Sequence, residues 1–169
     1  MSLPKIAKIT HELTIPSTGK KIKYRPFLVK EEKVLILAQE SGDQREMARA
    51  IKDVISACVQ TRGFNVDELA TFDIEFLFLN IRGNSVGGDV EVVITCPDDE
   101  VTRVPVTIYL DQIQVLIDED HTPIVKLDDE YSVKMKYPTM EMIMDTDGDN
   151  VSVEQSFELI AGCIEQIYS

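Results

Sequence analysis

Histidine and cysteine are the residue types best suited to catalysis, but they form no catalytic motif in this sequence of 169 residues. The two histidines, His11 and His121, lie outside any Ser–His–Asp or Cys–His pattern. The cysteines at 58, 96 and 163 are odd in number and far apart, which indicates reduced thiols instead of a disulfide framework. We therefore expect no enzyme activity and no cofactor.

Three short segments resemble ligand-binding loops, and each lacks a residue that the ligand needs. The glycine-rich stretch 83–88 has no Gly-Lys-Ser/Thr after it, so we interpret it as a bend before a strand. The acidic stretch 145–150 ends in Asn150 where a calcium loop needs its glycine. In Cys96-Pro97-Asp98-Asp99, an aspartate stands where a zinc knuckle has its second cysteine. We predict no metal site.

The elements that position these residues begin with a predicted hairpin and two helices. Alternating runs on both sides of Pro16-Ser17-Thr18-Gly19 are typical of a hairpin. Residues 29–40 predict a helix with Val34, Leu37 and Ala38 on one face. A second helix is predicted near residues 47–58, closed by Gly63, and its apolar stripe consists of Met47, Ile51, Val54, Ile55 and Cys58.

Residues 66–82 fit both a strand and a helix. Phe72, Ile74, Phe76 and Phe78 alternate, whereas Ile74, Leu77, Phe78 and Ile81 share a helical face. Acidic residues near the start and the length of the apolar run favour a helix. Seven of the ten residues from Phe72 to Ile81 are hydrophobic, so this helix is expected either inside the core or with one face on a partner.

The second half of the chain predicts two β-hairpins and a last helix. One hairpin joins residues 90–94 and 104–110, and the other joins 124–127 and 131–137. Ser152 and Gln155 have the spacing of a capping box. The last helix is expected to bury the stripe Phe157, Ile160, Ala161, Ile164 and Tyr168.

These elements predict an α+β fold with a helical N-terminal half, central antiparallel β-hairpins and a C-terminal helix. We expect one compact unit with three regions. These are an N-terminal hairpin plus helical region at 1–88, a β-rich region at 89–138 and a C-terminal helical tail at 139–169.

Charge is unevenly distributed along the chain, whose formal net charge is −13. Residues 1–40 hold eight basic and four acidic residues, a balance of +4, and residues 41–169 hold nine basic and 26 acidic residues, a balance of −17. The acidic excess argues against nucleic-acid binding. The longest apolar run, five residues, is too short to cross a membrane, and the N-terminus has no leader-like run, so a cytoplasmic location is expected. Two interpretations of this uneven charge remain open. The charges keep the chain soluble, or the two ends of the chain contact neighbours of different charge.

The order of several blocks resembles a known family. Arg25 to Lys33 opens a helix, Phe72 to Leu79 leads to Arg82 and Ser85-Val86-Gly87, and a strand ends at Cys96-Pro97. Over roughly residues 6–137, this order resembles the baseplate hub subunits and hub assembly proteins of T-even-type bacteriophages. In that family the Cys-Pro turn often carries a Cys-x-x-Cys pair, from which Asp99 departs.

The resemblance implies a non-enzymatic structural or assembly protein of the tail baseplate hub of a contractile-tailed phage. Its partners would be other hub or tail proteins, in the host cytoplasm during assembly and in the tail baseplate. Both a virion component and a transient assembly helper fit this interpretation. The alternative is an acidic phage protein that binds and inhibits a host nucleic-acid-associated factor. The candidate interface residues are Phe76, Phe78, Arg82, Lys21, Lys23 and Arg25.

Overall fold

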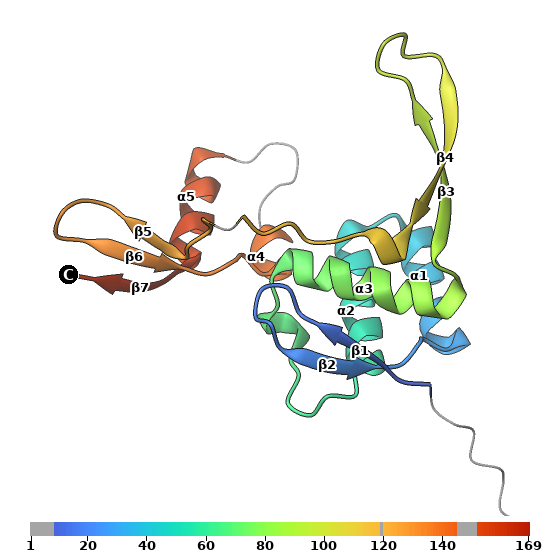
Figure 1. Cartoon of the computed structure of the whole chain (residues 1–169), viewed down its shortest axis with the longest axis horizontal. Helices are drawn as coiled ribbons and strands as arrows, with labels where there is room; N and C mark the ends of the chain where they lie inside the picture. Colours follow the sequence, from blue (N-terminus) through green and yellow to red (C-terminus); the bar gives the residue numbers. More distant parts are fainter. Residues whose placement is uncertain (1–8, 119, 145–151) are drawn as a thin grey trace, which may run out of the picture.

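A computed structural model describes residues 9–118, 120–144 and 152–169 of the chain. The elements form three parts, which we call the core, the arm and the C-terminal lobe (Figure 1). The core contains β1 (His11–Thr14), β2 (Lys21–Tyr24), α1 (Val29–Ser41), α2 (Gln44–Cys58), the 3-10 turn η1 (Val66–Glu68) and α3 (Thr71–Val86). The arm is the hairpin of β3 (Asp89–Thr95) and β4 (Arg103–Tyr109), followed by the 3-10 turn η2 (Leu110–Gln112). The C-terminal lobe contains β5 (Ile124–Lys126), β6 (Ser132–Met135), α4 (Met140–Met144), α5 (Val153–Gly162) and β7 (Ile164–Tyr168).

The core forms where α2, α3 and the β1–β2 hairpin bury their apolar faces against one another. The predicted stripe of α2 is confirmed, because Val54, Ile55 and Cys58 are buried. The segment that fitted two periods is helix α3, which buries Ile74, Leu77 and Ile81. Buried side chains from all these elements form one cluster: Ile15, Ile22, Tyr24, Val54, Ile55, Cys58, Val66, Leu69, Ile74, Leu77 and Ile81.

A buried carboxylate fixes the β1–β2 turn on α3. Asp73 has no exposed surface, and its side chain accepts hydrogen bonds from the backbone N–H and the hydroxyl of Ser17. Such bonds offset the large cost of removing a carboxylate from water. The turn is therefore held against α3, while the β1–β2 pair keeps Leu13 opposite Ile22 in antiparallel register.

The arm is a long hairpin that projects away from α3 (Figure 1). Its antiparallel register pairs Val90 with Ile108, Val92 with Val106 and Ile94 with Val104. Its base is anchored in the core. Leu110 is buried beside Gly83 of α3, and its N–H donates to the carbonyl oxygen of Gly88 at 2.7 Å.

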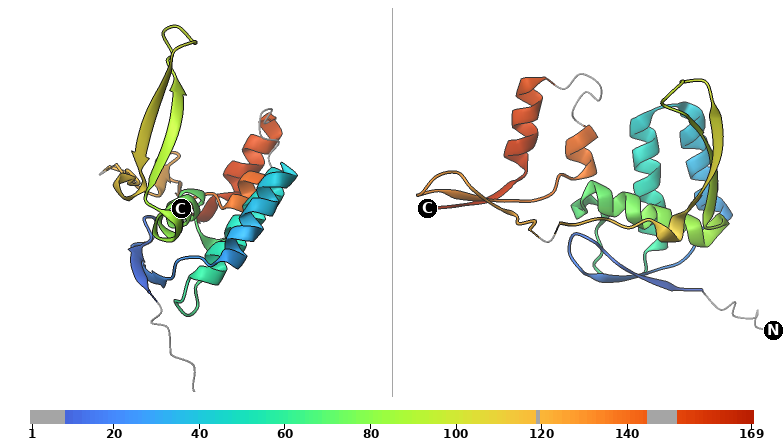
Figure 2. Two further views of the ribbon diagram at one scale, coloured as in Figure 1. Left: turned by 90° about the vertical axis from the view of Figure 1, so that its right-hand side faces the viewer. Right: turned by 45° about the horizontal axis from the view of Figure 1, so that its top comes forward.

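The C-terminal lobe lies on the far side of the core from α1, beside the N-terminal end of α3 (Figures 1 and 2). Its sheet has the order β5-β6-β7, all antiparallel. The ring of Tyr137 packs edge-on against Phe72 of α3, with centroids 4.9 Å apart. Arg45 of α2 donates to the carbonyl oxygen of Met144 at 3.3 Å, which joins α4 to the core.

The predicted order of elements is wrong, although the α+β class is consistent with the structure. Helices and strands are interleaved: the first half combines the predicted hairpin with helices, α4 and α5 lie between β6 and β7, and the strand β7 follows the helix expected to end the chain. The last helix stops at Gly162, a poor helix former. The β-branched residues that follow it pair instead with the open edge of β6. The division at 1–88, 89–138 and 139–169 stays a prediction, and the sheet β5-β6-β7 joins residues on both sides of 138.

Several side-chain expectations also change. The stripe predicted as buried on the last helix is exposed, with Phe157 at 68% and Ile160 at 54%. In α1, the face turned inward consists of Glu31, Leu35 and Ala38, so Val34 and Leu37 are exposed. These three inward residues have the i, i+4, i+7 spacing of one helical face.

Two predicted boundaries move by a few residues. Helix α2 ends at Cys58, and Gly63 lies in the following turn with φ 74°. Helix α3 continues to Val86, through most of the glycine-rich stretch 83–88 that was predicted to be a bend. Gly87, whose φ is 122°, ends the helix. The capping box of Ser152 and Gln155 is confirmed. The acidic stretch 145–150 lies outside the described residues.

Candidate partner-binding surfaces

The predicted interface residues of α3 are half-buried. Phe78 packs against the core cluster, which leaves only part of its ring for a partner. Phe76 lies elsewhere on the helix and is not part of that cluster. Arg82 has one buried guanidinium nitrogen, Nη1, without a hydrogen-bond partner among the described residues. Helix α3 therefore contributes mainly to the core and only partly to the surface.

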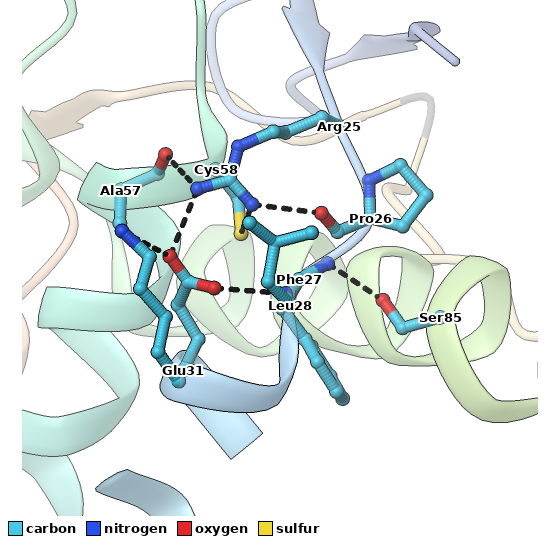
Figure 3. Close-up of polar contacts among 9 residues, drawn as sticks. Arg25, Pro26, Phe27, Leu28, Glu31, Ala57, Cys58 and Ser85 are labelled. Atoms are coloured by element: carbon cyan, nitrogen blue, oxygen red, sulfur yellow. Dashed lines mark hydrogen bonds and ion pairs between the residues drawn. The ribbon is translucent and has the colours of Figure 1, made fainter. Parts of the chain in front are cut away.

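Arg25 lies in an ionic network inside the core, at the start of α1 (Figure 3). Its Nη2 atom lies 2.9 Å from Glu31 Oε1 and 2.9 Å from the carbonyl oxygen of Ala57. Its Nη1 atom donates to the carbonyl oxygen of Pro26 at 2.9 Å. The Arg25 and Glu31 side chains are 18% and 5% exposed. This guanidinium ties the end of β2 to both α1 and α2.

Glu31 completes the network by capping its own helix. Its Oε2 accepts the backbone N–H of Leu28 at 2.8 Å, the position of a capping-box glutamate. Nearby, the N–H of Phe27 donates to the hydroxyl of Ser85 at 2.9 Å, so the same segment is fixed to α3 (Figure 3). The segment before α1 is therefore held by the side chains of Glu31 and Ser85 and by a backbone carbonyl of α2.

Burial and hydrogen bonds shift two pKa values in this network. Burial alone raises the pKa of Glu31, but the bonds from Arg25 and from the Leu28 N–H, with the Arg25 charge, bring it below its ordinary value of 4.5. Burial raises the pKa of Cys58 to about 11, against the effect of the Arg25 charge. At neutral pH Glu31 is therefore ionised, and the Cys58 thiol is protonated and a poor nucleophile.

The predicted lysines lie apart from Arg25, on the exposed face of β2. Lys23 is exposed and forms an ion pair with Glu12 on β1 at 3.2 Å. Lys21 lines a hollow of about 400 Å³ between the β1–β2 turn and the loop after α2. Lys20 and Arg62 line the same hollow and were not among the predicted residues. We call this site the basic hollow.

One face of the arm is an uncovered apolar surface that the sequence did not predict as a site. Residues directly opposite in an antiparallel pair lie on the same face, as do residues two apart. The register therefore places six aliphatic side chains together, which are Val90, Val92, Ile94, Val104, Val106 and Ile108. Ile94 is 50% exposed and Val104 46%. The alternation of apolar residues in the sequence predicts that these side chains share a face. It does not tell whether another element covers that face.

A second uncovered apolar stripe lies along one face of α5. Val153, Phe157 and Ile160 have the i, i+4, i+7 spacing of one helical face and are 72%, 68% and 54% exposed. On β7, Ile167 is 64% exposed. The C-terminal lobe therefore resembles the arm, with regular elements whose apolar side chains lie at the surface.

The histidines have structural partners. His11 stacks on Tyr24, and His121 Nε2 lies 2.7 Å from the hydroxyl of Tyr137. Within residues 9–118, 120–144 and 152–169, no three His, Cys, Asp or Glu side chains are grouped to hold a metal ion. In the same ranges, no helix combines the length and the apolar character needed to cross a bilayer.

A small ordered core that carries uncovered apolar faces on a projecting hairpin and a terminal helix is the form of a protein that binds other proteins. Comparison with family models agrees with this class. The model described as T4 bacteriophage base plate protein matches residues 6–169, and the chain belongs to that family. No curated protein and no solved structure is significantly similar to the chain.

Family membership makes this a baseplate-associated structural protein of a phage tail. It points to contacts with other baseplate proteins, to the tail baseplate of the virion as location, and to a non-enzymatic role. The match covers the core, the arm and the C-terminal lobe together.

Proposed function

We propose that this chain is a structural or assembly protein of the tail baseplate hub of a contractile-tailed phage and acts through protein–protein contacts. The observation that supports this most is the uncovered apolar face of the arm, in a chain of the baseplate family. A two-stranded hairpin alone in water is marginally stable. Full burial of an exposed aliphatic side chain stabilises by about 1.5–3 kcal/mol. The side chains of this face are half exposed or less, so each gains part of that free energy when a partner covers it.

The two groups of residues predicted from the sequence have different places in this proposal. Lys21 and Lys23 are exposed to an acidic partner, and Lys23 would exchange its ion pair with Glu12 for that contact. Phe76, Phe78 and Arg82 offer the exposed parts of half-buried side chains on α3. Arg25 is less accessible than the two lysines, and we propose that it acts by holding β2, which carries the lysines, against the core.

Co-expression with the hub proteins of the same phage tests the proposal. Size-exclusion chromatography with light scattering should give a complex that contains both this 19.1 kDa chain and a hub protein, with a mass above that of the chain run alone at the same concentration. Two neighbouring substitutions on opposite faces of β3 form a matched pair. Val92→Asp places a charge on the apolar face and should abolish the complex, whereas Val93→Asp, on the opposite face, should leave it intact.

The outcomes separate the alternatives. A chain that stays alone with hub proteins but binds a host nucleic-acid enzyme would contradict the hub role and support an acidic inhibitor. Equal loss of the complex in both arm variants would contradict the use of the apolar face. Mass spectrometry of purified virions then distinguishes a component of the particle, which is present, from an assembly helper, which is absent.

A further inference from the structure

The basic hollow combines an apolar floor with a positively charged rim. Ile15, Ile22 and Leu69 are buried beneath it. Lys20, Lys21 and Arg62 are exposed around it, against one acidic lining residue, Glu68. Within the part of the chain that the structure describes, no ion pair includes any of these three cations. The hollow therefore suits an acidic segment that also carries an aliphatic side chain.

The tip of the arm has that chemistry. Asp98, Asp99 and Glu100 are consecutive, and Val101 beside them is 79% exposed. Asp99 accepts the backbone N–H groups of Val101 and Thr102 at 3.1 and 2.9 Å, which fixes the turn. Glu100 has a positive φ of 54°. The turn thus presents two further carboxylates and a valine at the end of the arm.

The tip and the hollow of one molecule cannot meet, because they lie on opposite sides of α3. In Figure 1 and in both views of Figure 2, the arm extends from α3 away from the β1–β2 hairpin. The arm carries the tip clear of its own body. A second molecule can therefore approach it without a clash with the core.

We propose that the basic hollow receives the arm tip of a second copy of this chain. The carboxylates of Asp98 and Glu100 lie against Lys21 and Arg62, and Val101 covers the apolar floor. Because the two surfaces differ, the contact is heterologous and generates a ring or an open chain of copies instead of a two-fold dimer. The inference does not depend on the hub role.

Another acidic turn, at residues 128–130 of the C-terminal lobe, is the less suitable occupant. There Lys126 Nζ lies 2.9 Å from Asp129, so one carboxylate already has its cation. No basic residue lies between Cys96 and Thr102 at the arm tip. The turn at 128–130 therefore supplies a control of similar composition.

Charge reversal in the purified full-length chain tests the proposal. The measurement is sedimentation velocity over a concentration series at about 0.15 M salt. At this ionic strength, the repulsion between chains of net charge −13 is screened beyond a Debye length of about 8 Å. The average mass of the wild type should rise above the 19.1 kDa of one chain as its concentration increases. The tip variant Asp98→Lys/Glu100→Lys and the hollow variant Lys21→Glu/Arg62→Glu should each associate about tenfold more weakly or worse. Both leave Asp99 and the buried floor unchanged.

Mixing gives the decisive result. An equimolar mixture of the tip variant and the hollow variant restores one opposite-charge contact at each junction and should recover the wild-type mass. The control Asp129→Lys/Glu130→Lys keeps Asp128, which accepts the backbone N–H groups of Glu130 and Tyr131, and should assemble like the wild type. A wild type that is monomeric at every concentration overturns the proposal, as does a mixture that stays monomeric or a control that loses assembly. None of these results affects the co-expression test of the hub role, because that test measures a complex with other proteins.

Discussion

In the core, Ile55, Leu77 and Ile81 have no exposed surface, whereas in the arm Ile94, Val104 and Ile108 are 38–50% exposed. Both regions have regular secondary structure and aliphatic residues at the expected period. The core covers its apolar faces with α2, α3 and a hairpin, and the arm has one sheet face with nothing comparable over it. The stability of the molecule therefore comes mainly from the core, and the arm presents an exposed apolar face.

The polar groups of the two regions differ in the same way. In the core, Asp73 and Glu31 are buried and accept hydrogen bonds from Ser17, Arg25 and backbone N–H groups. At the arm tip, Asp99 accepts hydrogen bonds from Val101 and Thr102 of its own turn. The core's buried charges thus fix its elements in place, whereas the tip's charges remain in solvent.

The largest expected effect is the truncation of a leucine in the core. Leu77→Ala removes a side chain with no exposed surface and should lower the free energy of unfolding by about 2–5 kcal/mol. Leu116→Ala is the matched control, because Leu116 is 92% exposed. Chemical denaturation of both variants checks the difference. Equal effects would contradict the assignment of stability to the core.

An aspartate at position 78 should be the next most damaging change. Phe78 packs against the core cluster, so Phe78→Asp loses that packing and places a charge beside apolar side chains. We expect a loss of about 2–3 kcal/mol, within the range of large single-site effects. Phe76→Asp, outside the cluster, should cost less. Circular dichroism reports folding, and light scattering with hub proteins reports binding. A folded Phe78→Asp variant that loses only its complex would show that this ring is an interface residue.

Removal of Arg25 should also destabilise the core. Arg25→Met leaves Glu31 buried without its main cation, and we expect a loss of about 2–3 kcal/mol, because Lys30 at 3.3 Å remains. The matched change at an exposed pair is Lys23→Met, which should cost less than about 1 kcal/mol. Thermal denaturation of the two variants compares them. A larger loss at Lys23 would refute the structural role of Arg25.

The smallest effect is a dependence of stability on acid. Because the pKa of Glu31 is lowered in the folded chain, its contribution is complete above its ordinary value of 4.5 and is lost as pH falls through the lowered value. The stability difference between the wild type and Glu31→Gln should therefore shrink as the pH falls below 4.5. Urea titrations at a series of pH values measure it. A constant difference would mean that Glu31 is not the titrating group.

The sequence predicted the elements with strong patterns. The stripe of α2, helix α3, both central hairpins and the Ser152 cap follow from periodicity and turn residues, and all are present. The end of the chain was mispredicted, because Phe157, Ile160 and Ile164 fit a helical stripe as well as they fit a helix followed by a strand. Only the open edge of β6, a tertiary feature, decides between the two.

The candidate site was harder to predict than the fold. The acidic first turn of α1 was visible, but the sequence does not show that Arg25 reaches Glu31 and the end of α2. Likewise, Arg62 joins Lys20 and Lys21 only because the loop after α2 folds beside the β1–β2 turn. The alternating aliphatic residues of β3 and β4 were visible in the sequence, but the exposure of their apolar face was not, since the same pattern also describes a strand covered by a helix.

Hydrogen exchange, measured on the isolated chain and on the chain in complex with its co-expressed hub proteins, tests the central claim most directly. In the isolated chain, amides of α2 and α3 should be strongly protected and those of β3 and β4 weakly protected, because the arm is a lone two-stranded sheet with a solvent-exposed apolar face. In the complex, β3 and β4 should become protected while α2 and α3 stay unchanged. Arm amides that exchange equally fast in both states would contradict the account.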